Sequence, residues 1–220
     1  MQELTFIWDM DGTLVDSYPA IVPAAAEALA ALGLPVEEEA LRRRMLRSSV
    51  KAVLEELASE NGLDAAALRA DFARSNDSHI SAIPAMPHAA ETLSALRAAG
   101  HRSFVYTHRG ASCPVILEQT GLRGYFTEVV TALQGFPRKP APDGILYLIG
   151  KYGLDPARCW YVGDRRLDVE AAENAGIGSI LLRTAESPVL ATGREGHVIG
   201  SLAEIPGLFG IAPVRSGDRT

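Results

Sequence analysis

The stretch Phe6-Ile7-Trp8-Asp9-Met10-Asp11-Gly12-Thr13-Leu14 decides the fold that this sequence predicts. Residues 4–8 form an apolar run of β-branched and aromatic character, which is typical of a short buried strand. Asp and Gly are poor strand formers, so we expect the strand to end at Asp9 and the chain to turn. Open α/β sheets bind ligands at the carboxyl ends of their strands. The pattern indicates such a functional strand end, and the plainer alternative is a hairpin with an Asp-Gly turn.

Composition limits the classes of protein that are possible. The chain has 220 residues, is 47% hydrophobic and carries a net charge of −6, so it can bury a core and has no basic tract for nucleic acid. Its start lacks the basic region of a signal peptide, and Pro23 and Glu27 interrupt the apolar residues 20–34, which argues against a membrane span. Cys113 and Cys159 are too few for a disulfide framework, so we expect buried thiols and a cytoplasmic protein.

Two regions differ in their periodicity. Apolar residues recur at helical spacing after Pro19, and the predicted helices there span residues 20–32, 37–45, 49–60 and 64–76. Beyond a proline-rich connector, helices predicted at 88–99, 112–120, 143–152 and 168–175 alternate with strands at 102–106, 128–131, 159–162 and 179–182. This alternation predicts an α/β fold, a Rossmann-like parallel sheet with helices on both faces. We expect residues 1–15 and 85–220 to form this core, residues 16–84 to be a helical insertion, and residues 215–220 to fray.

Three further groups of polar residues each follow the end of a predicted strand. The first is Thr107-His108-Arg109, where a hydroxyl and helix-start amides suit a phosphate oxygen or simply cap a helix. The second is Lys139, held between prolines, which is either a fixed positive charge or a solvated loop residue. The third is Gly163-Asp164 with Asp168. If a helix begins at Asp164, the two acids share one face, and helix capping is the alternative role.

The order of these motifs along the chain resembles that of the haloacid dehalogenase superfamily: Asp-x-Asp-Gly-Thr, then Thr107, then Lys139, then Gly-Asp-x-x-x-Asp. The helical insertion after the first motif resembles the C1-type cap, and the nearest members are phosphoglycolate phosphatase-like. The resemblance implies a Mg²⁺-dependent phosphatase that acts on a small phosphorylated metabolite through an aspartyl-phosphate. From the charge and composition we expect no nucleic-acid or membrane partner, and the oligomeric state stays open.

The resemblance also assigns roles to residues. Asp9 would attack phosphorus, Asp11 would protonate the leaving group and then activate water, and Lys139 would offset the clustered negative charge. The expected Mg²⁺ ligands are Asp9, the Asp11 carbonyl, Asp164 and, through water or by orienting Lys139, Asp168. The expected phosphate contacts are Gly12, Thr107, His108 and Arg109.

Within the superfamily that the motifs resemble, Asp11 favours phosphate-ester hydrolysis over dehalogenation. The dehalogenases lack an acid at this position, because a halide needs no proton to leave. The alternatives are a hexose-phosphate mutase, which keeps both acids, and a non-catalytic binding or regulatory protein on the same fold.

Some candidate residues lie outside the fixed positions of the motifs. Arg43, Arg47 and Arg165 are candidate substrate-specificity residues, although the cap arginines could equally form a solvated face balanced by nearby glutamates. His79, His88, His101 and His197 lack metal-ligand spacing, and we expect them on the surface. His88 follows Met86-Pro87 where relatives often have Pro-Gly.

Overall fold

The computed structural model describes residues 2–184, 191 and 193–212, so the predicted fraying of residues 215–220 lies outside the described residues. The chain divides into two compact units, Met1–Val15 with Ala85–Thr220, and Asp16–Pro84. Among the described residues, no helix is both long and apolar enough to cross a membrane.

In the part of the chain that the structure describes, the first unit is built on a parallel sheet of six strands, which confirms the predicted α/β fold. The strands are β1 (Thr5–Trp8), β2 (Arg102–Tyr106), β3 (Val129–Val130), β4 (Cys159–Gly163), β5 (Gly178–Leu182) and β6 (His197–Ile199), in the order β3-β2-β1-β4-β5-β6. Strand β1 is buried along its whole length, with Ile7 opposite Phe104 on one side and Tyr161 on the other. The first strand of the chain therefore lies in the middle of the sheet.

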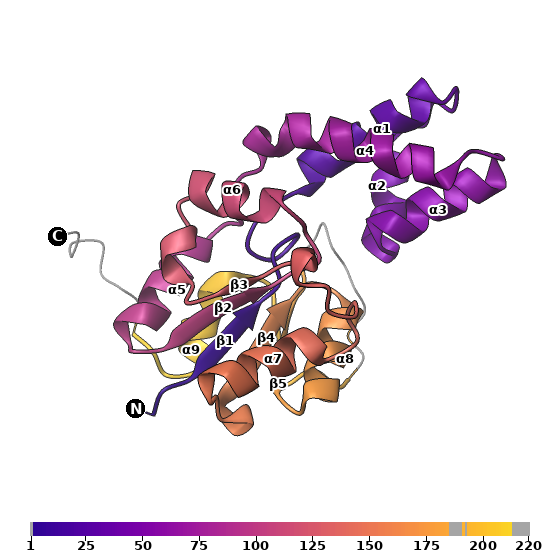
Figure 1. Ribbon diagram of the computed structural model, residues 1–220. Helices are drawn as coiled ribbons and strands as arrows, with labels where there is room; N and C mark the ends of the chain where they lie inside the picture. Colours follow the sequence, from indigo (N-terminus) through magenta and orange to yellow (C-terminus); the bar gives the residue numbers. More distant parts are fainter. Residues whose placement is uncertain (1, 185–190, 192, 213–220) are drawn as a thin grey trace. The chain divides into compact units, whose positions relative to one another are not determined.

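Helices cover both faces of this sheet, as parallel strands require. They are α5 (Ala89–Ala98), α6 (Ser112–Gln119), α7 (Asp143–Tyr152), α8 (Arg166–Ala175) and α9 (Ile205–Leu208), with 3₁₀ turns at Arg123–Tyr125, Ala132–Gln134, Pro156–Arg158 and Leu202–Glu204. Helices α5 and α9 pack together on one face, and α7 and α8 cover the other (Figure 1). One core cluster joins strands β1, β2 and β4 to α7 and α8 through Ile7, Phe104, Tyr106, Ile145, Leu148, Tyr161 and Ala172.

The second unit contains four α-helices with a core of their own. They are α1 (Tyr18–Ala31), α2 (Glu38–Arg47), α3 (Val50–Glu60) and α4 (Ala65–His79), followed by a 3₁₀ turn at Ile80–Ala82. The side chains of Glu37, Ser49 and Asp64 accept hydrogen bonds from backbone N–H groups and cap α2, α3 and α4. The shared core includes Ile21, Leu29, Leu41, Met45, Leu54 and Leu68.

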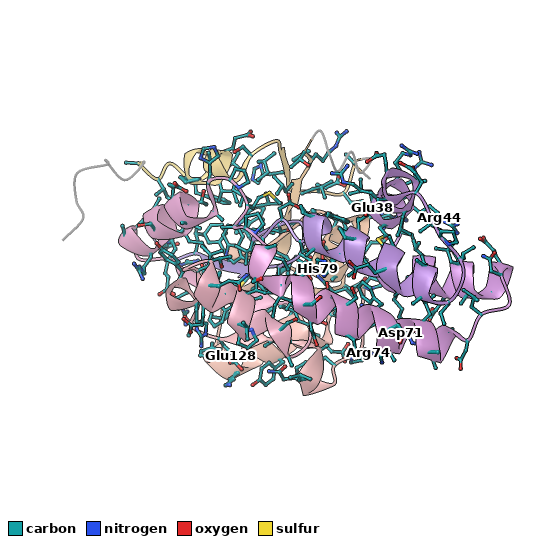
Figure 2. The ribbon with its side chains drawn as sticks, turned by 90° about the horizontal axis from the view of Figure 1, so that it is seen from above. Glu38, Arg44, Asp71, Arg74, His79 and Glu128 are labelled. Carbon is teal, nitrogen blue, oxygen red and sulfur yellow. The ribbon has the colours of Figure 1, made fainter. Side chains whose placement is uncertain are left out.

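Charged pairs line the surface of this helical unit. Arg44 reaches Glu56 and Glu60 at 3.2 and 3.4 Å. Asp71 and Arg74 pair within one turn of α4 (Figure 2). Exposed pairs of this kind contribute little to stability, so the apolar core is what holds the unit together.

The histidine prediction is wrong for His101, which is 6% exposed. Its Nδ1 accepts a hydrogen bond from the Leu4 N–H at 3.1 Å, just before β1 begins. Burial lowers the pKa of His101, so the ring is neutral and serves as a hydrogen-bond acceptor. His88 is exposed, with φ +66°, the left-handed conformation that favours glycine.

Candidate active site

Three buried carboxylates meet where β1 and β4 end. The Asp9 N–H donates to the Val162 carbonyl at 2.8 Å, which extends the pairing of β1 with β4 and sets Asp9 beside the residues that follow β4. One carboxylate oxygen from each of Asp9, Asp164 and Asp168 lies within 4.8 Å of the others. This is the convergence of acids that the order of motifs predicted.

The turn after β1 requires glycine at position 12. Gly12 has φ +83°, and a Cβ at this position would lie 2.4 Å from Asp164 Oδ2. The turn is closed by the Leu14 and Val15 N–H groups, which donate to the Met10 carbonyl, and the Gly12 N–H donates to the Val15 carbonyl at 2.9 Å. The absent side chain is what lets the Asp164 carboxylate approach this turn.

Burial raises the pKa of both Asp9 and Asp164. It raises the pKa of Asp9 to about 6, against the opposing charge of Lys139, and raises the pKa of Asp164 to about 7, against Arg165. Asp164 Oδ1 accepts a hydrogen bond from the Thr13 hydroxyl at 3.3 Å. Its Oδ2 is buried and has no hydrogen-bond partner in the described part of the chain. An orphaned carboxylate oxygen among further acids fits a hard cation such as Mg²⁺.

The geometry of Asp164 and Asp168 differs from one sequence hypothesis. Helix α8 begins at Arg166, so Asp164 precedes it and the two acids do not share a helix face. A turn brings them together instead, because the Asp168 Oδ2 accepts a hydrogen bond from the Arg165 N–H at 3.1 Å. A Cβ at Gly163 would lie 2.4 Å from the Asp168 Cβ, so this glycine makes room for Asp168.

Lys139 connects the acids. Its side chain is 2% exposed, and Nζ lies 2.8 Å from Asp9 Oδ1 and 2.6 Å from Asp168 Oδ1. A third hydrogen bond, of 3.0 Å, goes to the Tyr161 hydroxyl, which donates to the Tyr106 carbonyl at 2.7 Å. Burial acts to lower the pKa of Lys139, but Asp168 and Asp9 outweigh it and raise that pKa well above its ordinary value. The sequence gives no sign of this role for Tyr161, because the residue lies in an otherwise apolar predicted strand.

The loop after β2 contains three of the four predicted phosphate contacts, and the fourth, Gly12, lies in the turn after β1. Thr107 is buried, and its Oγ1 accepts a hydrogen bond from the Arg109 N–H at 3.1 Å. His108 Nε2 accepts from the Lys139 N–H at 2.9 Å. Burial, with the nearby Lys139 and Arg138 charges, lowers the pKa of His108 to about 3. The ring is therefore neutral with its proton on Nδ1, and it ties the Thr107 loop to the Lys139 loop.

The Arg109 side chain has a partner that the sequence did not indicate. Its guanidinium lies on the Asp11 carboxylate, with Nη2 2.6 Å and Nε 2.9 Å from Oδ1. Nη1 donates to the Ser112 hydroxyl at 3.2 Å. Sequence reasoning considered only the backbone of Arg109, because the distance between two loops 98 residues apart has no local signal.

The three predicted specificity residues lie in both units. Arg165 is half-buried between β4 and α8. Arg43 and Arg47 are exposed on α2, and Arg43 Nη1 lies 3.3 Å from Glu39 Oε1 one turn earlier. This last pair fits the alternative of a solvated face, and the roles of all three arginines in substrate choice stay predictions.

Comparisons with known proteins identify a family, sequence relatives and structures with a similar fold. A sequence model of the family described as haloacid dehalogenase-like hydrolase matches residues 6–182. The phosphoglycolate phosphatase of Vibrio vulnificus (strain YJ016) is 33% identical over 193 residues, 81% of this chain and 83% of the relative. A Haemophilus somnus structure described as a predicted phosphoglycolate phosphatase aligns with a TM-score of 0.82 at 23% identity, over 95% of this chain and 99% of that one. CbbY from Rhodobacter sphaeroides, solved with phosphate, aligns with a TM-score of 0.79 at 21% identity, over 96% and 99%. At these identities the two structures show a shared fold.

Proposed function

The chain belongs to the haloacid dehalogenase-like hydrolase family, and on this premise we propose that it is a Mg²⁺-dependent phosphatase for small phosphorylated metabolites. The observation that carries the proposal is the buried Lys139 ammonium between Asp9 and Asp168, with Asp164 in the same cluster. A phosphoryl group is anionic, so a site that transfers it must combine a nucleophile with fixed positive charge. The relatives named phosphoglycolate phosphatase support the same reaction class.

Asp9 is the proposed nucleophile. Its carboxylate attacks phosphorus, the bond from phosphorus to the leaving oxygen breaks, and an aspartyl-phosphate forms. Lys139, 2.8 Å from Asp9 Oδ1, holds the carboxylate in one orientation and offsets the charge that accumulates on the transferring group. Water then cleaves the aspartyl-phosphate and releases inorganic phosphate.

Asp11 is the proposed acid and base. Its carboxyl proton passes to the leaving oxygen as the first bond breaks, and its carboxylate takes a proton from the attacking water in the second step. It lies two residues beyond Asp9, on the turn that Gly12 closes.

The donor set suits Mg²⁺. Asp9, the Asp11 backbone carbonyl and Asp164 would hold the ion, and Asp168 would act through water or through Lys139. The orphaned Asp164 Oδ2 supports this assignment. When bound, Mg²⁺ supplies Lewis-acid stabilisation of charge on the phosphoryl oxygens.

The proposed phosphate contacts are the Thr107 hydroxyl, the His108 Nδ1–H, and the N–H groups of Gly12 and Arg109. Both of these N–H groups donate within their own loops in the structure, so phosphate would replace those internal acceptors. Residues 16–84 are the proposed cap, which selects the leaving group with Arg43, Arg47 or Arg165 as candidates. A cytoplasmic location stays a prediction.

The test is release of inorganic phosphate from a panel of phosphorylated acids and sugars, with and without Mg²⁺. We expect Mg²⁺-dependent release, and we expect Asp9→Asn to abolish it while the fold is kept. Asp155→Asn is the control, because Asp155 is an exposed acid paired with Arg158 at 3.2 Å before β4. A mutase would interconvert sugar phosphates with little free phosphate, and a binding protein would turn over nothing. Either result would replace the phosphatase proposal.

A further inference from the structure

We propose that the Arg109 side chain is a positioning residue that sets the orientation of the Asp11 carboxylate and thereby controls proton delivery to the leaving group. The inference rests on the proposed function, in which Asp11 is the acid. It assigns to Arg109 a side-chain role separate from its backbone contact with phosphate.

The Arg109 guanidinium donates to the Asp11 carboxylate through two of its nitrogen atoms. Nε and Nη2 of Arg109 both reach Asp11 Oδ1, at 2.9 and 2.6 Å, and Nε lies 3.1 Å from Oδ2. A planar guanidinium with two donors in fixed geometry defines the plane of the carboxylate as well as its position. A lysine would supply the same charge as a point and would not define that plane.

Arg109 is itself held in place. Nη1 donates to Ser112 Oγ at 3.2 Å, the backbone N–H donates to Thr107 Oγ1 at 3.1 Å, and the carbonyl accepts from the Ala132 N–H at 3.1 Å. The side chain is 6% exposed, and that of Asp11 is 19% exposed. Exposed pairs are mobile and weak, whereas this pair is mostly buried and anchored at several points. The arginine can therefore transmit a fixed geometry to Asp11.

In the first step of the reaction, the orientation of Asp11 matters only when the leaving oxygen needs a proton. An alkyl phosphate leaves as an alkoxide, which must take the Asp11 proton as its bond to phosphorus breaks. A p-nitrophenyl phosphate leaves as a phenolate that the nitro group stabilises without a proton. Because a displacement of about 1 Å in a reacting group can cost about 10²-fold in rate, loss of Arg109 should penalise alkyl esters selectively.

The experiment compares kcat/KM for ethyl phosphate, phosphoglycolate and p-nitrophenyl phosphate, since kcat/KM reports the steps through departure of the leaving group. We expect Arg109→Gln to lower the value for both alkyl esters by about 10- to 100-fold and for p-nitrophenyl phosphate by less than about 3-fold. Arg109→Lys, which keeps the charge and protects the fold, should show the same selectivity in smaller degree. Arg158→Gln, which removes an arginine paired with Asp155, is the control and should leave all three values unchanged.

Asp11→Asn separates this inference from the proposed function. It should reproduce the selective loss, and Arg109→Gln in that background should not change the ratio of alkyl to aryl activity further. If Asp11→Asn leaves the ratio unchanged, Asp11 is not the acid and the proposed mechanism fails together with the inference. If Asp11→Asn changes the ratio but Arg109→Gln lowers all substrates equally, or raises alkyl activity, the inference alone is overturned. Loss with phosphoglycolate but not ethyl phosphate would mean that Arg109 binds the substrate carboxylate, which also overturns it.

Discussion

Tyr161→Phe removes a single oxygen atom and tests whether Lys139 depends on it. The hydroxyl accepts one hydrogen bond from Lys139 Nζ at 3.0 Å and donates another to the Tyr106 carbonyl at 2.7 Å. The ammonium otherwise contacts Asp9 and Asp168, so the substitution takes away one of its three acceptors. The ring remains, so no cavity of any size is created.

The decrease in the free energy of unfolding can be estimated from these two hydrogen bonds. A hydrogen bond to a charged group contributes about 1.5–3 kcal/mol and a neutral one about 1 kcal/mol, so we expect the free energy of unfolding to fall by about 3 kcal/mol. The assay is urea denaturation followed by tryptophan fluorescence, which reports the first unit because Trp8 and Trp160 both lie in its sheet. We also expect kcat to fall about tenfold or more with little change in KM, because Lys139 would be displaced and its proposed role is to offset charge in the transition state.

Tyr147→Phe is the matched control. The Tyr147 hydroxyl likewise accepts from a lysine, Lys151 at 2.9 Å, and donates to an acceptor, Glu128 at 3.1 Å. That lysine is exposed to solvent, which replaces the lost contact, so stability should change much less and kcat should stay at the wild-type value. The reasoning is refuted if Tyr161→Phe costs no more stability than Tyr147→Phe and keeps full kcat.

Three other predictions use single positions. Gly12→Ala should destabilise the protein and abolish Mg²⁺-dependent turnover, because the added Cβ would meet Asp164 Oδ2. Gly100→Ala is the control: Gly100 has φ +80° with open space around it, so the substitution should lower the free energy of unfolding in urea by only about 1 kcal/mol and keep kcat. Equal effects of the two substitutions would contradict the steric argument. In metal-free protein, the raised pKa of Asp164 means that the folded state holds a proton which the unfolded chain loses, so stability from this group is full below about pH 4 and is lost as pH rises through about 7. Asp164→Asn should flatten that decline by at most about 4 kcal/mol, and an unchanged pH profile of denaturation would show that the acid is not perturbed. His88→Gly should raise the free energy of unfolding by about 1 kcal/mol, because φ +66° strains a side chain but not glycine; a destabilised variant would argue against strain there.

Sequence patterns predicted the parallel sheet because its strands and helices are long enough to show their periods and end at glycines. The helix predicted at 143–152 and the strand predicted at 102–106 match α7 and β2. Strand β6 was missed because it has three residues, of which one is buried, and so has no visible alternation. His101 was misplaced because an acceptor for a backbone N–H at a strand start has no local signature.

The site was predictable as a set of residue types and their order, because the carboxyl ends of parallel strands lie along one edge. The structure adds the contacts among them, which depend on distances across the sheet. Tyr161 could have been suspected only from its polar atom on an otherwise apolar strand. The Arg109–Asp11 pair joins two loops whose relative position depends on the pairing of β1 with β2.

The central position of β1 has a consequence for the synthesis of the protein. Strand β1, which leads into Asp9, is translated before both of its neighbours in the sheet, yet it needs β2 on one side and β4, residues 159–163, on the other. A nascent chain that ends before β4 already contains Asp9, Asp11 and Lys139 but lacks Asp164 and half of the sheet around β1. Because long-range parallel pairing must wait for both partners, hydrolysis cannot begin before β4 has been translated. Truncated products that end before residue 159 should therefore be inactive even though they carry Asp9, the proposed nucleophile.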